Sequence, residues 1–235
     1  MSRDMRVKLV AGIFAIAFVP HVATGQLATP TKPAAVEKLG PNLFRLGAVR
    51  VDTANREVSV SGKVNPDVMT LEFIANTKDG WRAYESAVSL DTDAITYNAA
   101  LVLIGLDGSH AKGVPQQHFD PTALSGDVVT VTIECPKGEC ERMPAERLMF
   151  DRSKKETVSG GKWIYTGSSF LADGRFVADV GAVLFGFVHD PATVIEYSVG
   201  AGLGNYGGIV VNPNLGIAPG TVITLTVKAP SQPAR

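Results

Sequence analysis

The chain has 235 residues, of which 45% are hydrophobic and 19% are charged, and its formal net charge is −1. This is the composition of an ordinary globular protein, and the length is sufficient to bury a core in one domain. The near-neutral charge and the lack of any lysine and arginine cluster argue against a nucleic-acid partner, which needs a basic surface.

The first 25 residues have the pattern of an export signal. Three basic residues precede an apolar run at 9–19, and small residues then allow cleavage after Gly25 or, alternatively, after Ala23. The apolar run is shorter than the roughly 20 residues that a membrane-spanning helix needs. We therefore expect an exported protein, in the periplasm, in the cell envelope or secreted, with no membrane span after signal cleavage.

Residues 26–44 are rich in proline, alanine and threonine and lack periodicity over most of their length, so we predict a flexible linker there. After this segment, apolar and polar residues alternate in short runs between turn residues, which is the pattern of β-strands. Strands are predicted at 47–51, 57–64, 70–76, 81–90, 127–134, 141–150, 162–166, 175–178, 181–188, 209–211 and 221–227.

One segment has a strongly helical pattern. Asp91, Thr92 or Asp93 can cap its N-terminus, apolar residues follow at helical spacing on nearly every face, and Gly105 and Gly108 end it. We expect this helix to be buried on most sides and to lie at the centre of the core.

A second, short helix is predicted at 192–197, because Pro191 suits the first turn of a helix. Strands dominate the pattern, so the predicted fold class is α+β, with a mainly antiparallel β-sheet, one buried helix and one short helix. The predicted organisation is a single globular domain over residues 45–229, followed by a disordered tail at 230–235.

Cys135 and Cys140 flank a turn sequence between two predicted strands. In an exported protein the expected state of such a pair is a disulfide, which stabilises the turn locally. Free thiols, a redox site and a metal site are the alternatives. A CxxC redox motif has two intervening residues instead of four, and a metal site requires two further ligands.

Four residues are candidates for catalysis: Glu85, Ser86, His189 and Asp190. Nucleophilic catalysis would require the serine, the histidine and the carboxylates to converge in space. The serine lies in no GxSxG motif, and adjacent strand residues point to opposite faces of a sheet. In the competing structural interpretation, Glu85 is a paired strand residue and the His189–Asp190 pair forms a corner.

No metal and no cofactor are expected. His110 and His118 are eight residues apart in an irregular loop, which is no recognised ligand spacing, and we interpret them as solvated loop histidines. The loop 202–207 matches GxGxxG, but it opens no helix and no acidic residue follows Glu196, so we interpret it as a flexible loop.

Trp163 and Tyr165 lie two residues apart in a predicted strand and therefore face the same side. They could line a ligand-binding surface, although packing in the core is the commoner use of such an aromatic pair.

Five extended stretches of the chain form a distinctive set of patterns. They are 49–65 (VRVDTANREVSVSGKVN), 84–108 (YESAVSLDTDAITYNAALVLIGLDG), 144–152 (PAERLMFDR), 163–170 (WIYTGSSF) and 173–195 (DGRFVADVGAVLFGFVHDPATVI). Together they resemble the YdjY-like domain family of exported bacterial proteins, over about residues 45 to 228. The resemblance implies export and a single domain, but no reaction, because the family is essentially uncharacterised.

The resemblance also points to positions to test first. They are Glu85, Ser86, Trp163, Tyr165, Gly167, Ser168, His189 and Asp190, of which Trp163, Tyr165 and Ser168 are the ligand-binding candidates. The family pattern usually has histidine before the Glu-Ser pair, where this chain has Tyr84. If that histidine is a ligand or a base in the family, this member lacks it.

Two hypotheses follow. In the first, the protein is a non-enzymatic exported domain that binds an envelope or extracellular ligand or protein through its sheet surface and loops. In the second, it is an exported hydrolase or metal-dependent enzyme that uses Glu85, Ser86 and His189. The second hypothesis requires these side chains to lie within hydrogen-bond or ligand reach of one another.

Overall fold

The structure is a computed structural model that describes residues 31–136, 140–202 and 206–231. The signal peptide predicted at 1–25, the end of the predicted tail and the centre of the glycine-rich loop at 202–207 lie outside these ranges. Within them, every helix is too short or too polar to cross a membrane.

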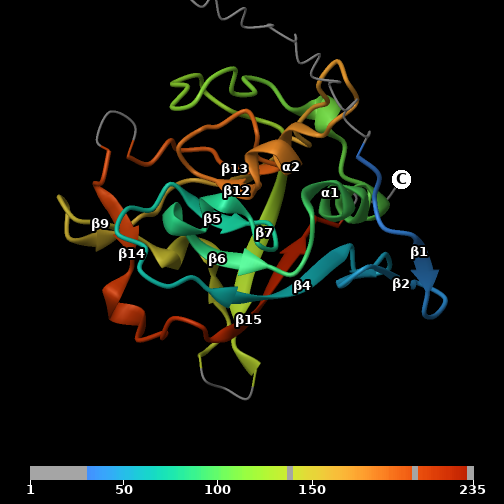
Figure 1. Ribbon diagram of the computed structural model, residues 1–235, viewed down its shortest axis with the longest axis horizontal. Helices are drawn as coiled ribbons and strands as arrows, with labels where there is room; N and C mark the ends of the chain where they lie inside the picture. The colour runs from blue at the N-terminus through green and yellow to red at the C-terminus, as the bar shows by residue number, and fades with distance from the viewer. Residues whose placement is uncertain (1–30, 137–139, 203–205, 232–235) are drawn as a thin grey trace, which may run out of the picture.

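Eight strands form a closed barrel of mixed strand direction (Figure 1). In order around the barrel they are β4 (Glu57–Val64), β15 (Val222–Lys228), β7 (Asp127–Glu134), β11 (Trp163–Tyr165), β13 (Ile195–Tyr197), β12 (Val183–Gly186), β5 (Phe73–Asn76) and β6 (Ser86–Leu90). Pairing of β6 with β4 closes the barrel. The pairs β12–β13 and β5–β6 are parallel, and the other neighbours around the barrel are antiparallel.

Further strands extend the barrel at its margins. The strands β1 (Val36–Lys38), β2 (Leu43–Leu46) and β3 (Val49–Asp52) form a meander on β4, and β8 (Met143–Pro144) pairs with β7. A separate sheet contains β10 (Glu156–Thr157), β9 (Met149–Asp151) and β14 (Ile209–Val211). In Figure 1, β9 and β14 lie at the left of the barrel, and β1 and β2 lie at its right.

The helices are short. The α-helices are α1 (Ala94–Leu103) and α2 (Val177–Gly181), and the described 3-10 helices include η1 (Trp81–Glu85), η2 (Gly108–His110), η4 (Ala145–Leu148) and η5 (Pro213–Leu215).

The barrel core follows from the alternation of side chains along the strands. On β4 and β7 every second residue is buried, as the apolar–polar alternation predicts. Phe185 of β12 lies at the centre of an aromatic cluster. Its ring centroid is 6.2 Å from that of Trp163 on β11 and 5.7 Å from that of Tyr97 on α1. The buried Tyr97 therefore anchors α1 to the core of the barrel.

The helix α1 begins where the sequence predicts. Asp93 caps it, since its Oδ1 accepts a hydrogen bond from the backbone N–H of Thr96 at 2.7 Å. The helix is buried on most sides, as expected, since six of its ten residues are buried. It packs against β3, β2 and α2, whereas Val102 and Leu103 on its other side are exposed.

The prediction of a short helix at 192–197 is wrong. These residues form a turn followed by β13, which pairs with β11 and β12. The second α-helix is α2, which includes part of the strand predicted at 175–178. In both segments tertiary pairing outweighs local preference: β13 completes the barrel, and α2 packs against α1 outside it.

The fold is therefore mainly β, not α+β. The predicted strand at 81–90 is divided into η1 and β6, and the predicted linker at 26–44 contains β1 and the start of β2. β1 was overlooked because it is short and all three of its residues are exposed, so no apolar alternation marks it.

The disulfide between Cys135 and Cys140 is present, with the two Cα atoms 5.0 Å apart. It lies between β7, which it follows directly, and β8.

Candidate functional site

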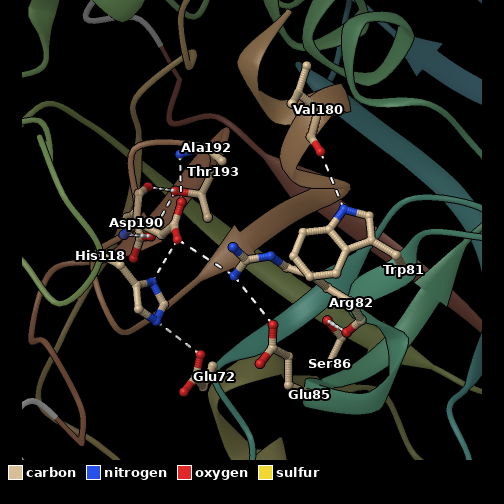
Figure 2. Close-up of polar contacts among 11 residues, drawn as sticks. Glu72, Trp81, Arg82, Glu85, Ser86, His118, Val180, Asp190, Ala192 and Thr193 are labelled. Atoms are coloured by element: carbon tan, nitrogen blue, oxygen red, sulfur yellow. Dashed lines mark hydrogen bonds and ion pairs between the residues drawn. The ribbon is translucent and has the colours of Figure 1, made fainter. Parts of the chain in front are cut away.

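Five charged side chains from four segments meet at one end of β5 (Figure 2). Glu72 directly precedes β5, Arg82 and Glu85 belong to η1, His118 comes from the loop before β7, and Asp190 comes from the turn after β12. We call these five residues the charged cluster. The closed barrel brings them together, since the four segments are far apart in the sequence.

Arg82 lies at the centre of the charged cluster. Its Nη1 is 3.3 Å from Oε1 of Glu85 and 3.7 Å from Oδ2 of Asp190. Its guanidinium group lies between two aromatic rings, 4.6 Å from the ring centroid of Trp81 and 4.9 Å from that of Phe73. This position is favourable because arginine stacks on aromatic faces and keeps its charge.

His118 bridges two carboxylates. Its Nδ1 is 2.7 Å from Oδ2 of Asp190, and its Nε2 is 3.1 Å from Oε2 of Glu72. The hydrogen bonds to Asp190 and Glu72 raise the pKa of His118 to about 9. The imidazole is therefore protonated at neutral pH and donates from both nitrogens. The interpretation of His118 as a solvated loop histidine is wrong, because it ties its loop to the barrel.

Hydrogen bonds at both its side chain and its backbone hold Asp190 in place. Its Oδ1 accepts a hydrogen bond from the backbone N–H of Ala192, and its own backbone N–H donates to Oε1 of Glu196. Burial alone would raise the pKa of Asp190, but the hydrogen bonds from His118 and Ala192 and the charge of Arg82 together lower it. Asp190 is therefore a fixed anion of the charged cluster.

Glu196, on β13, supports this turn. Its Oε1 also accepts a hydrogen bond from the Thr193 hydroxyl at 2.7 Å. Complete burial raises the pKa of Glu196 to about 8, so at neutral pH the carboxyl group is largely protonated. Among the described residues, its Oε2 has no hydrogen-bond partner. Glu196 thus orients the turn that presents Asp190.

Glu85 is the acid of the charged cluster whose ionisation is disfavoured. Burial and the nearby charge of Glu72 raise the pKa of Glu85, although Arg82 opposes this shift. Glu85 and Asp190, both in contact with Arg82, therefore have pKa values displaced in opposite directions.

The carboxylates and the aromatic rings differ in exposure. Glu72, Glu85 and Asp190 are buried, whereas Trp81 is 58% exposed and Tyr84 is 57% exposed. Trp81 and Tyr84 both belong to η1, and we call their exposed side chains the η1 surface. The Nε1–H of Trp81 donates to the carbonyl oxygen of Val180, which helps to fix the indole ring (Figure 2). The charged cluster is thus covered at Arg82 by the exposed indole ring of Trp81.

The structure brings two of the four catalytic candidates together. Glu85 and Asp190 both contact Arg82. The hydroxyl of Ser86 is engaged elsewhere, since it donates to the carbonyl oxygen of Arg82 at 2.9 Å. Both ring nitrogens of the buried His189 face backbone carbonyl oxygens, at 2.9 and 3.1 Å. Ser86 and His189 therefore form part of the backbone hydrogen-bond network.

The three ligand-binding candidates have structural contacts. Trp163 and Tyr165 are buried, and they donate hydrogen bonds to Glu146 and Asn98 respectively. The hydroxyl of Ser168 is 3.3 Å from the carbonyl oxygen of Ala192. Trp163 and Tyr165 thus pack in the core, which is the commoner of the two uses considered for this aromatic pair.

Three residues of the charged cluster were not predicted: Glu72, Arg82 and His118. Sequence spacing gives no signal for them because their segments meet only when the barrel closes. The adjacent Trp81 and Arg82 were the one available hint, since both residue types are common at binding surfaces.

The described residues contain no group of three or more His, Cys, Asp or Glu side chains arranged to hold a metal ion. In the charged cluster, His118 is instead bonded to two carboxylates through both nitrogens. His110 is exposed, and its Nδ1 is 2.9 Å from Oδ1 of Asp127.

The fold and the charged cluster define a mainly β protein built on an eight-stranded mixed barrel. The model of the YdjY domain family matches residues 49–184. The chain therefore belongs to the YdjY domain family. No curated protein and no solved structure matches it.

The match covers most of the barrel and its site. It includes Glu72, η1 and His118, whereas Asp190 and Glu196 lie beyond its end.

The ion pairs of His118 predict a pH dependence of stability. The pKa of His118 rises from 6.5 to about 9 on folding, so its contribution is complete below pH 6.5 and is lost as the pH rises through 9. In His118→Gln this contribution is absent at every pH. The difference in unfolding free energy between the natural protein and the variant, measured by urea denaturation, should therefore shrink across this range. A difference independent of pH would contradict the ion pairs.

Proposed function

We propose that the protein is an exported, non-enzymatic binding module that holds an envelope or extracellular ligand or protein on its η1 surface. The observation that carries this proposal is the pair of exposed aromatic side chains, Trp81 and Tyr84, on a segment fixed by the charged cluster. Exposed aromatic rings are costly to leave in water, and contiguous ones mark interaction sites.

The composition and rigidity of η1 support binding. Trp, Tyr and Arg are the residues that contribute most to binding energy at protein interfaces. Here Arg82 supports the indole ring of Trp81 from one side, and Val180 accepts its N–H. A side chain that is ordered before binding loses less entropy when the ligand arrives. The indole ring of the η1 surface is therefore ordered before a partner binds.

The state of the polar groups supports binding over chemistry. The hydroxyl of Ser86 and the ring nitrogens of His189 are bonded to backbone carbonyl oxygens. An activated nucleophile instead needs its hydroxyl directed at a neighbouring base. In this arrangement neither Ser86 nor His189 is available for a catalytic role.

An enzyme remains the second candidate, because one observation favours it. The pKa values of Glu85 and Asp190 are displaced in opposite directions, as in paired acid and base groups of active sites. Arg82 contacts both carboxyl groups, and a structural ion-pair network produces the same displacement. An enzyme of this kind would lose turnover in Glu85→Gln while it retained binding.

Export rests on the N-terminal signal pattern and is supported by the disulfide. Cys135 and Cys140 are joined, and such bonds persist in oxidising compartments outside the cytosol. We therefore place the binding function in the periplasm, in the envelope or outside the cell.

A photo-reactive benzoylphenylalanine in place of Tyr84 tests the proposal in cells that produce the protein natively. We expect a crosslinked product at this position, because Tyr84 lies on the η1 surface. The control is the same residue in place of Val102, which is 52% exposed on α1 and lies outside this surface. Equal crosslinking at both positions, or none at Tyr84, would contradict the proposal.

A further inference from the structure

We infer that the ligand of the η1 surface is a neutral glycan, with a sugar ring stacked on Trp81 and its hydroxyl groups bonded by polar side chains of η1. This inference rests on the proposed binding function and names the chemical class of the ligand.

The indole ring of Trp81 forms a platform on which a sugar ring can stack. One side of the indole ring faces the guanidinium group of Arg82, 4.6 Å from the ring centroid, and Nε1 is bonded to Val180. The ring is nevertheless 58% exposed. A held indole ring with an open face suits the C–H face of a pyranose, which packs flat on an aromatic ring through dispersion and weak C–H contacts.

Cationic and acidic side chains balance one another around this platform. Arg82 and the protonated His118 are cationic, and they face three acidic side chains, one of which, Glu85, has a raised pKa. A ligand with a strong net charge would be repelled by half of these groups. A neutral sugar meets no such repulsion, and its hydroxyl groups can accept hydrogen bonds from the partly exposed side chain of Arg82.

Two polar side chains come from the same segment as Trp81. The side chain of Arg82, which stacks on the indole ring, is 18% exposed. The phenol of Tyr84 lies on the same 3-10 helix as Trp81, three residues further on. Trp81 and Tyr84 are both more than half exposed. Trp81 therefore has polar neighbours that can bond hydroxyl groups of a stacked sugar.

The two tryptophans of the chain give a direct test. Trp81 is exposed, whereas Trp163 is 3% exposed, so acrylamide quenches mainly the fluorescence of Trp81. The probes are the neutral hexamers of the cello-, malto- and chito-oligosaccharide series, with a galacturonate hexamer as the anionic probe and a glucosamine hexamer as the cationic probe. We expect at least one neutral hexamer to protect Trp81 from acrylamide, and both charged hexamers to protect it less.

Calorimetry on variants connects protection to the stacked ring. The affinity of the protecting hexamer should fall about tenfold or more in Trp81→Ala and less in Trp81→Phe, which keeps an aromatic face. Phe170→Ala is the matched control, because Phe170 is also 58% exposed but packs against Phe176. Its affinity should equal that of the natural protein.

Three results would overturn the inference: stronger protection by a charged hexamer, no protection by any hexamer, or equal affinity in Trp81→Ala. None of them decides the proposed function, which the crosslink at Tyr84 tests separately. A Tyr84-specific crosslink to a protein, without protection by any hexamer, would retain the binding module and discard the glycan.

Discussion

Arg82→Met is expected to lower the free energy of unfolding by about 3 kcal/mol, because it removes one partner of a largely buried ion-pair network. Arg82 is the cation that Glu85 and Asp190 share, and its guanidinium group also fills the space between Trp81 and Phe73. Methionine replaces part of the apolar stem but leaves the carboxylate of Glu85 without a cation.

Two further variants show which property of Arg82 matters. Arg82→Lys keeps the charge but loses the planar group, so we expect an intermediate loss of stability. Arg50→Met is the control, because Arg50 is an exposed residue of β3. Chemical denaturation of all three proteins gives the comparison. If Arg82→Met were as stable as Arg50→Met, the charged cluster would not hold η1 in place.

Gly186→Ala is the second large effect that we expect, a loss of about 3 kcal/mol from overpacking between β12 and the turn that follows it. A Cβ atom at position 186 would overlap the carboxyl group of Glu196 and the methyl group of Thr193. Both of these side chains are buried, and Gly186 is part of β12, so neither side can move away easily.

Gly186→Ala should also disturb the charged cluster. Glu196 accepts the backbone N–H of Asp190, so its displacement should weaken the pair between Asp190 and His118. Gly40→Ala is the control, because a Cβ there makes only ordinary contacts with Leu43. Thermal denaturation measures the loss of stability, and the NMR titration of His118 measures the weakened pair as a lower pKa. Unchanged melting in Gly186→Ala would contradict the packing described for Glu196.

The features that the sequence could predict are local ones. The bounds of β4 and β7 follow from alternation within each strand, those of β14 follow from a short apolar run, and the disulfide follows from two cysteines that flank one turn sequence. The cap of α1 at Asp93 is likewise set within a few residues. Each of these depends on neighbours in the chain.

The features that the sequence could not predict depend on barrel closure. The pairing of β6 with β4 and the parallel pairs β5–β6 and β12–β13 have no local signature. The predicted helix at 192–197 failed for the same reason, since β13 is a strand only because β11 and β12 lie on either side of it.

The candidate site was found in part. Glu85 and Asp190 were named from the sequence, and the structure connects them through Arg82, which was not named. Ser86 was paired with Glu85 because the two are adjacent, but its hydroxyl turns back to the carbonyl oxygen of Arg82. Adjacency in the sequence therefore identified Glu85, a member of the charged cluster, but wrongly placed the hydroxyl of Ser86 beside it.

The most direct test of the central claim is the ¹⁹F NMR spectrum of the protein labelled with 5-fluorotryptophan, recorded with and without an extract of the native envelope. The two tryptophans give one resonance for the exposed Trp81 and one for the buried Trp163. The account predicts that the extract shifts or broadens the resonance of Trp81 and leaves that of Trp163 unchanged. Binding of the extract with an unchanged Trp81 resonance would place the partner elsewhere and contradict the account.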